Sequence, residues 1–239
     1  PKIKKSGSRE KNNFFFSAAS LIFSKKDMYL VSVSSKTAVP VPAAAFDLRK
    51  GGTAMLAEQP QIISLTQLAA VAGCSRDHIT QLYLHWTAGR YGQVYDDYHL
   101  NIDADGTVYR TSSLSQYKSH TWRRNSGSIA VALCCGLGAQ ANHGYDADLG
   151  QFAPTAVQTD KMAQTVALLV TALGLQLTID TVMTHCEAAL LDGYGPYSGD
   201  AETRWDLWYM RDSPGDGQMK PGGDILRGKA RWYLEHSKI

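Results

Sequence analysis

Two histidines and one aspartate, in separate blocks of the chain, have the side chains from which a catalytic metal site can be built. They are His85 in the block YLHWTAG, His185 in THCE and Asp206 in RWD. Two imidazoles and one carboxylate can bind a catalytic zinc ion and leave its fourth position for water. One histidine alone would indicate little, because most histidines at strand ends are ordinary polar residues. The three together predict a metal site.

The segments around these residues predict elements that would hold them. Residues 80–85 alternate between apolar and polar side chains, which predicts a short β-strand that places His85 where the strand runs into a glycine-containing loop. Another apolar segment, residues 179–183, precedes His185. We therefore expect both histidines on rigid elements facing a cleft.

Further strands are expected between these blocks. Residues 98–102 and 107–110 flank Asp105-Gly106, and Asp-Gly between two such runs is a strong hairpin signal. Residues 127–136 are nearly all apolar and are bounded by glycines, as in a strand buried on both faces.

Three helices are expected. Ser64 would cap a short helix that closes near Gly73, and Thr155 with Gln158 would form a capping box for a longer one. In that longer helix apolar residues recur at helical spacing up to Gly174, and a last helix begins near Asp224. Helices alternate with strands, so the expected fold class is α/β, with a central mixed β-sheet flanked by helices.

Composition excludes several other classes. The 239 residues are 44% hydrophobic and 19% charged, with a formal net charge of +2, so the dense basic face of a nucleic-acid-binding protein is not expected. Four cysteines without regular spacing predict neither a disulfide framework nor a structural zinc knuckle, and the pair Cys134-Cys135 is expected to be buried. The chain contains no internal repeat and no phosphate-binding loop motif.

The N-terminal quarter has a different character. Its longest apolar run, residues 14–23, is too short to span a bilayer, and lysines follow it where a signal-peptide cleavage site would need small residues. Neither a transmembrane segment nor a signal peptide is therefore expected. We interpret residues 1–61 as an N-terminal extension of unclear role and residues 62–239 as the main domain.

Five blocks, in order, carry a family resemblance. They are LHWTAG (84–89), YHLNIDADGTVY (98–109), GSIAVAL (127–133), THCEAA (184–189) and RWD (204–206). This order resembles the zinc-dependent N-acetylmuramoyl-L-alanine amidases, whose fold is shared with peptidoglycan recognition proteins. The resemblance covers residues 62–239 and implies that fold for this chain.

The resemblance also implies roles for individual residues. His85 and His185 would be zinc ligands, and Asp206 would be the third, at a position where family members have Asp or Cys. Tyr98 matches a tyrosine that assists the metal-bound water in part of the family. Arg204 stands where lysine is usual, so it would keep the positive charge but with a different reach and no ability to deprotonate.

Two acidic positions complete this picture. Some relatives place a glutamate in the strand where this chain has Ala132, so a carboxylate base from that strand is not available and Tyr98 becomes the main candidate. Glu187 neighbours His185, but it is interpreted equally well as the stabilising acidic residue at a helix start.

Aromatic residues gather around the ligand blocks, where their faces could hold glycan or stem peptide. The candidates for substrate binding are Trp86, Tyr91, Trp122 and Tyr197, with Tyr95, Tyr194 and Trp208 nearby. Core packing explains about half of them equally well. His99 and His120 could line the cleft, but structural roles are favoured for both.

The resemblance implies a hydrolase with zinc as its cofactor. It would cut the amide between N-acetylmuramic acid and L-alanine in peptidoglycan or a muropeptide, as an endolysin, an autolysin or another lytic enzyme. Two alternatives stay open: a recognition module that binds peptidoglycan without cutting it, and a cytosolic amidase that recycles muropeptides. We expect a monomer made in the cytoplasm; a lytic enzyme would act on the cell wall.

Overall fold

The computed structural model describes residues 55–200, 203–213, 215 and 217–236. The chain divides into two units, Pro1–Val39 and Pro40–Ile239, and all described residues belong to the second. The apolar run at residues 14–23 lies outside the described residues, as does nearly all of the expected extension, so the boundary at residue 61 stays a prediction.

A six-stranded mixed sheet forms the centre of the second unit, in the order β1-β4-β3-β5-β2-β8. Its strands are β1 (Gln61–Ile62), β2 (Gln81–Trp86), β3 (Leu100–Ile102), β4 (Val108–Arg110), β5 (Ser128–Leu133) and β8 (Val182–Thr184). Strands β3, β5, β2 and β8 run parallel, whereas β1, β4 and β3 pair antiparallel. The expected mixed sheet is confirmed.

The two central strands are buried along almost their whole length. Every residue of β5 is buried, and so is every residue of β2 except Gln81. Burial on both faces explains why β5 has an almost continuous apolar sequence. Strand β2, in contrast, contains the buried polar residue His85. In the parallel register His85 lies beside Ala132, so these two side chains leave the same face of the sheet.

The expected hairpin joins β3 and β4. The Gly106 N–H donates to the Asp103 carbonyl and the Asp103 N–H donates to the Thr107 carbonyl, both at 2.9 Å. Gly106 has a φ of 85°, so the loop needs a residue that tolerates the left-handed region.

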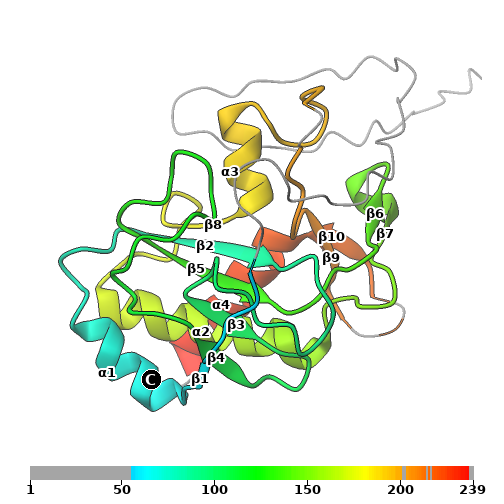
Figure 1. Ribbon diagram of the computed structural model, residues 1–239. Coiled ribbons are helices and arrows are strands. Elements are labelled where there is room, and N and C mark those ends of the chain that lie inside the picture. Colours follow the sequence, from blue (N-terminus) through cyan, green and yellow to red (C-terminus); the bar gives the residue numbers. More distant parts are fainter. Residues whose placement is uncertain (1–54, 201–202, 214, 216, 237–239) are drawn as a thin grey trace, which may run out of the picture. The chain divides into compact units, whose positions relative to one another are not determined.

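Within the described ranges, four helices accompany the sheet: α1 (Leu65–Gly73), α2 (Ala156–Leu173), α3 (His185–Asp192) and α4 (Gly222–His236). Figure 1 shows α1, α2 and α4 on one side of the sheet and α3 on the other. The capping boxes expected for α1 and α2 are present, and Gly174 ends α2 in the left-handed region. Gly73, in contrast, is the last residue of α1 and Cys74 caps it, so that glycine has no left-handed role.

Shorter elements complete the described part of the chain. They are β6 (Gln140–Ala141), the 3-10 turn η1 (Gly144–Asp146), β7 (Ala147–Asp148), β9 (Tyr209–Arg211) and β10 (Met219–Pro221). Strands β6 and β7 pair with each other, as do β9 and β10. Among the described residues, no helix combines the length and apolar character that crossing a bilayer requires.

Candidate metal centre

His85, His185 and Asp206 come together although they are far apart in sequence. One ligand atom from each can be chosen so that all lie within 4.8 Å of one another, and all three residues are buried. His85 Nδ1 lies 3.1 Å from Asp206 Oδ2, and His185 Nδ1 lies 3.2 Å from Asp206 Oδ1. The two imidazole rings meet edge to face, with centroids 4.8 Å apart.

Local structure explains how each side chain reaches this place. His85 is near the carboxyl end of β2, and His185 is the first residue of α3, directly after the parallel neighbour β8. Thr184 and Glu187 form a capping box that fixes the start of α3 and thereby the direction of His185. Asp206 follows in the segment before β9.

This group of atoms fits a metal ion by its donor chemistry. Zinc ligands at about 2.0–2.1 Å from the ion stand about 3.3 Å apart in a tetrahedral site, which agrees with the two short distances. Asp206 Oδ1 is buried and lies 3.2 Å from His185 Nδ1, yet within the described part of the chain it has no hydrogen bond of good geometry, although a buried carboxylate oxygen normally has one. Nitrogen and oxygen donors of this kind suit zinc.

The protonation states also fit. Burial lowers the pKa of His85 to about 4, although the neighbouring Asp206 carboxylate acts in the opposite direction. Burial by itself would raise the pKa of Asp206, but the His185 and His85 imidazoles outweigh it and hold that pKa well below its usual range. At neutral pH the pair is therefore a neutral imidazole and a carboxylate, the forms that bind metals.

Tyr98 lies against this group. Its ring centroid is 5.0 Å from that of His85. Burial, and next to it the charge of Asp206, raise the pKa of Tyr98 well above its usual value. The phenol therefore keeps its proton at neutral pH, so it can donate a hydrogen bond but does not serve as a phenolate base.

Arg204 lies in the same region. Its backbone N–H donates to the Tyr194 carbonyl at 3.2 Å. Its charge also acts on the pKa of Tyr98, although burial and the neighbouring carboxylates dominate there. The hydrogen bond to Tyr194 ties Arg204 to the segment that follows α3.

Glu187 is not free to act as a base. Both of its carboxylate oxygens accept hydrogen bonds from Arg227 of α4, and one of them also accepts the Thr184 N–H at 2.8 Å. Its interpretation as a helix-start residue is confirmed by the capping box.

The predicted substrate-binding aromatics separate into two groups. Trp86 is only 3% exposed and packs in the core against Trp205, while Tyr91 donates its hydroxyl to the Ala153 carbonyl at 2.6 Å. Trp122 and Tyr197 are 52% and 68% exposed. Of the four predicted residues only this second pair is mostly exposed, and the Arg123 guanidinium lies over one face of Trp122, 4.1 Å from the ring centroid.

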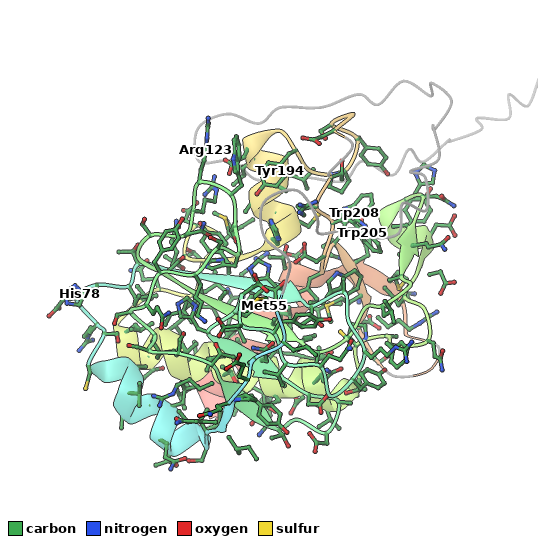
Figure 2. All side chains as sticks on the ribbon, viewed as in Figure 1. Met55, His78, Arg123, Tyr194, Trp205 and Trp208 are labelled. Carbon is green, nitrogen blue, oxygen red and sulfur yellow. The ribbon has the colours of Figure 1, made fainter. Side chains whose placement is uncertain are left out.

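Tyr194 links the exposed aromatic residues to the metal group. Its ring meets Trp122 edge to face at 5.5 Å and His185 at 6.2 Å between centroids. The Tyr194 hydroxyl is buried and, among the described residues, has no hydrogen-bond partner. Figure 2 shows Tyr194 beside α3, with Trp205 and Trp208 on the same side of the sheet.

Thr121 and His120 lie against His85, which was not predicted; the His120 and His85 rings meet edge to face with centroids 5.4 Å apart. The Thr121 hydroxyl lies 3.3 Å from His85 Nε2, and the same hydroxyl lies 2.9 Å from His120 Nδ1. His99 is structural, as favoured: its Nδ1 accepts the Ala130 N–H and its Nε2 lies 2.7 Å from the Gln116 carbonyl. In the sequence, only the short distance of Thr121 from His120 could have indicated this arrangement.

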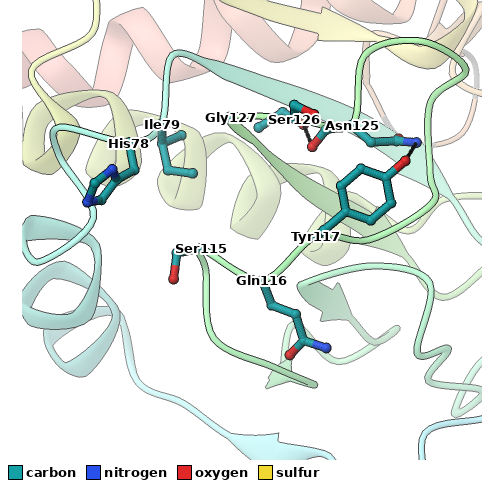
Figure 3. A pocket seen from close by; sticks show the side chains of 9 residues that line it. His78, Ile79, Ser115, Gln116, Tyr117, Asn125, Ser126 and Gly127 are labelled. Atoms are coloured by element: carbon teal, nitrogen blue, oxygen red, sulfur yellow. Dashed lines mark hydrogen bonds between the residues drawn. The ribbon is translucent and has the colours of Figure 1, made fainter.

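A separate hollow of about 400 Å³ opens near the start of β5. Figure 3 shows its lining, where Tyr117 and Asn125 share a hydrogen bond of 3.1 Å. None of the three candidate ligands lines it, so it is not the metal centre.

Comparison with known proteins identifies the family. The sequence profile of the N-acetylmuramoyl-L-alanine amidases matches residues 58–206. This stretch is more than half of the chain and ends on the third candidate ligand. The chain therefore belongs to the N-acetylmuramoyl-L-alanine amidase family. No curated protein matches it.

Solved structures show a weak likeness. The endolysin N-acetylmuramoyl-L-alanine amidase LysCS from Clostridium intestinale URNW is 13% identical with a TM-score of 0.35, over 57% of this chain and 80% of that one. The N-acetylmuramoyl-L-alanine amidase LysC from the same organism is 13% identical with a TM-score of 0.35, over 57% of this chain and 81% of that one. PGRP-Hd from Alvinella pompejana is 16% identical with a TM-score of 0.31, over 55% of this chain and 80% of that one. At these TM-scores the likeness adds nothing to the family assignment.

Proposed function

We propose that this protein is a zinc-dependent hydrolase that cuts the amide between the lactyl group of N-acetylmuramic acid and L-alanine of the stem peptide. The observation that carries the proposal is the convergence of His85, His185 and Asp206, with short nitrogen–oxygen distances and a buried carboxylate oxygen that has no well-formed hydrogen bond to the described residues. All three ligands come from one chain, so a monomer would contain the complete site.

His85, His185 and Asp206 would hold the ion. A bound zinc ion polarises a carbonyl group and lowers the pKa of a water molecule to about 7. The chain then has to orient the substrate amide and stabilise the charge that develops on its oxygen.

Two side chains are proposed to stabilise the negative charge that develops on the amide oxygen. The Tyr98 hydroxyl, which keeps its proton, can donate a hydrogen bond to the amide oxygen as it becomes negative. Arg204 adds a positive charge that cannot be lost at any working pH. Both would act more strongly on the transition state than on the ground state.

Substrate recognition is proposed for the exposed aromatic side. Tyr197 and the face of Trp122 opposite the Arg123 guanidinium would pack against sugar rings or the apolar parts of the stem peptide. The Tyr194 hydroxyl, buried without a partner among the described residues, would hydrogen-bond a polar group of the substrate between Trp122 and the metal. This assigns recognition to three aromatic residues around α3.

The experiment is incubation of the zinc-loaded protein with purified peptidoglycan. Release of new L-alanine amino termini without new reducing sugars is expected, with loss on chelation and recovery on adding zinc. His78→Ala, at an exposed histidine away from the site, is the matched control for His185→Ala. Binding of wall fragments without new amino termini would instead identify a recognition module. Cleavage of soluble muropeptides but not of intact walls would favour a recycling enzyme.

A further inference from the structure

A chain of buried side chains leads away from the metal centre on the far side of His85. It runs from His85 Nε2 to the Thr121 hydroxyl at 3.3 Å, to His120 Nδ1 at 2.9 Å, and from His120 Nε2 to the Ser128 hydroxyl at 3.2 Å. Each of these four residues is at most 7% exposed. The side chains of this series are therefore largely shielded from bulk solvent.

The backbone sets the direction of this chain at its far end. The Ser128 hydroxyl lies 2.9 Å from the Arg124 carbonyl oxygen and 3.0 Å from the Asn125 carbonyl oxygen. Carbonyl oxygens only accept, so the single Ser128 proton must go to one of them. Ser128 can then only accept from His120, which places the proton of His120 on Nε2.

The remaining steps follow from the same donor and acceptor rules. His120 Nδ1 carries no proton, so it accepts the hydroxyl proton of Thr121. The Thr121 oxygen has no second proton and must accept from His85, which therefore carries its proton on Nε2. His85 Nδ1 is left with a bare lone pair, and this is the atom 3.1 Å from Asp206.

Contacts with Asn125 and Tyr83 hold the middle of this hydrogen-bonded series in place. The Asn125 side-chain oxygen accepts the backbone N–H of His120 at 3.1 Å and that of Thr121 at 2.8 Å. The tilted contact of the Tyr83 ring with His120, at 5.8 Å between centroids, packs the imidazole from β2. His120 and Thr121 are therefore held by Asn125 of their own loop and by β2.

We infer that Ser128, His120 and Thr121 are positioning residues that lock His85 in the tautomer whose Nδ1 lone pair faces the metal. The inference rests on the proposed function, because it assumes that His85 binds zinc. In the locked tautomer, His85 Nδ1 and the Asp206 oxygen 3.1 Å away from it are both acceptors. A cation satisfies such a group, whereas a hydrogen bond between His85 and Asp206 would need the opposite tautomer.

The first test is the tautomer, read from nitrogen chemical shifts of histidine-labelled protein. In the wild-type protein His120 should be protonated on Nε2, with or without zinc, and zinc-loaded His85 should be protonated on Nε2 with a slowly exchanging proton. His120 protonated on Nδ1 would overturn the inference, whatever the protein does with metal.

The second test is zinc affinity, measured by competition with a chelator. Thr121→Val should weaken zinc binding about tenfold or more, and Thr121→Ser should restore most of the affinity because it returns the hydroxyl. The matched control is Thr165→Val, which removes a buried hydroxyl of α2 that has no partner among the described residues. It should leave affinity unchanged.

The two possible failures can be told apart. A wild-type protein that takes up no zinc, or whose uptake does not depend on His85, contradicts the proposed function and this inference together. Normal zinc binding by the wild type, with equal affinity in Thr121→Val, contradicts this inference alone. Equal losses in Thr121→Val and Thr165→Val would also contradict it, because the effect would then be general destabilisation.

Discussion

Arg227 donates from both ends of its guanidinium to Glu187, at 2.8 Å and 2.7 Å, and so joins α4 to the first turn of α3. The same guanidinium donates to the Val182 carbonyl of β8 at 3.0 Å. Gly223 of α4 makes room for the pair, because a Cβ at that position would lie 2.2 Å from a Glu187 oxygen. His185 is therefore placed by an ion pair that does not touch it.

This pair gives the first prediction. Arg227→Met should lower the free energy of unfolding by about 3 kcal/mol, because it leaves a partly buried carboxylate without its cation. It should also weaken zinc binding through the start of α3. Denaturant unfolding and chelator competition measure the two effects. Adding Glu187→Gln keeps an N3 cap and should recover part of the stability; no recovery would show that Arg227 acts by packing alone.

The second prediction concerns metal content. About one zinc per chain is expected, and His85→Ala, His185→Ala and Asp206→Ala should each lower it strongly, with His78→Ala unchanged. Chelation should lower the midpoint of thermal unfolding of the wild type, since the ion binds only the folded site. Elemental analysis and calorimetry check this. Full zinc in the Asp206→Ala protein would remove Asp206 from the ligand set.

A third prediction separates chemistry from metal binding. Tyr98→Phe keeps the ring that contacts His85 but removes the donor, so kcat on a soluble muropeptide should fall on the order of 10²-fold, with zinc content and KM little changed. Arg204→Ala should behave in the same way. Steady-state kinetics on zinc-loaded variants decide it, and unchanged turnover in either variant would exclude that residue from the transition state.

The fourth prediction is a pH dependence of stability. Burial lowers the pKa of His99 to about 4, below the value of about 6.5 that it has in an unfolded chain. The unfolded state therefore binds the proton first. Stability should fall as the pH drops from about 6.5 towards 4, by up to about 1.4 kcal/mol per pH unit for this one group, and be fully present above that window.

Urea unfolding of the chelated protein at several pH values measures this slope. His99→Gln keeps an acceptor and a donor but does not titrate. The slope of its unfolding free energy against pH should therefore correspond to about one proton fewer taken up on unfolding than in the wild type. Equal slopes in the two proteins would show that His99 is not held neutral by the fold.

Local sequence signals predicted most of the elements. Ser64, Thr155 and Gly174 act where their side chains or backbone freedom predicted, because caps depend on residues within one turn. The signals for the Asp-Gly turn and for the apolar strand at 128–133 also lie within the predicted elements themselves. Helix α4 begins at Gly222, two residues before the expected Asp224, and Gly223 lies close to Glu187, a contact that the sequence does not show.

The site was less predictable. The family blocks indicated His85, His185 and Asp206, and their convergence is observed. Tertiary packing decided the rest: Trp86 and Trp122 are both aromatic residues in loop-flanking blocks, yet one lies in the core and the other is exposed. Thr121 has no signature of its own, since a threonine acquires a role at His85 only through the path of the loop between β4 and β5.

The distribution of the thiols has a practical consequence. Cys134, Cys135 and Cys186 are buried, and burial raises the pKa of each, whereas Cys74 is exposed at the end of α1. Because the thiolate is the reactive form, the folded protein should present one thiol to a maleimide and the unfolded chain all four. A fluorophore on Cys74 would thus give a single-site optical reporter on α1, on the opposite side of the sheet from α3.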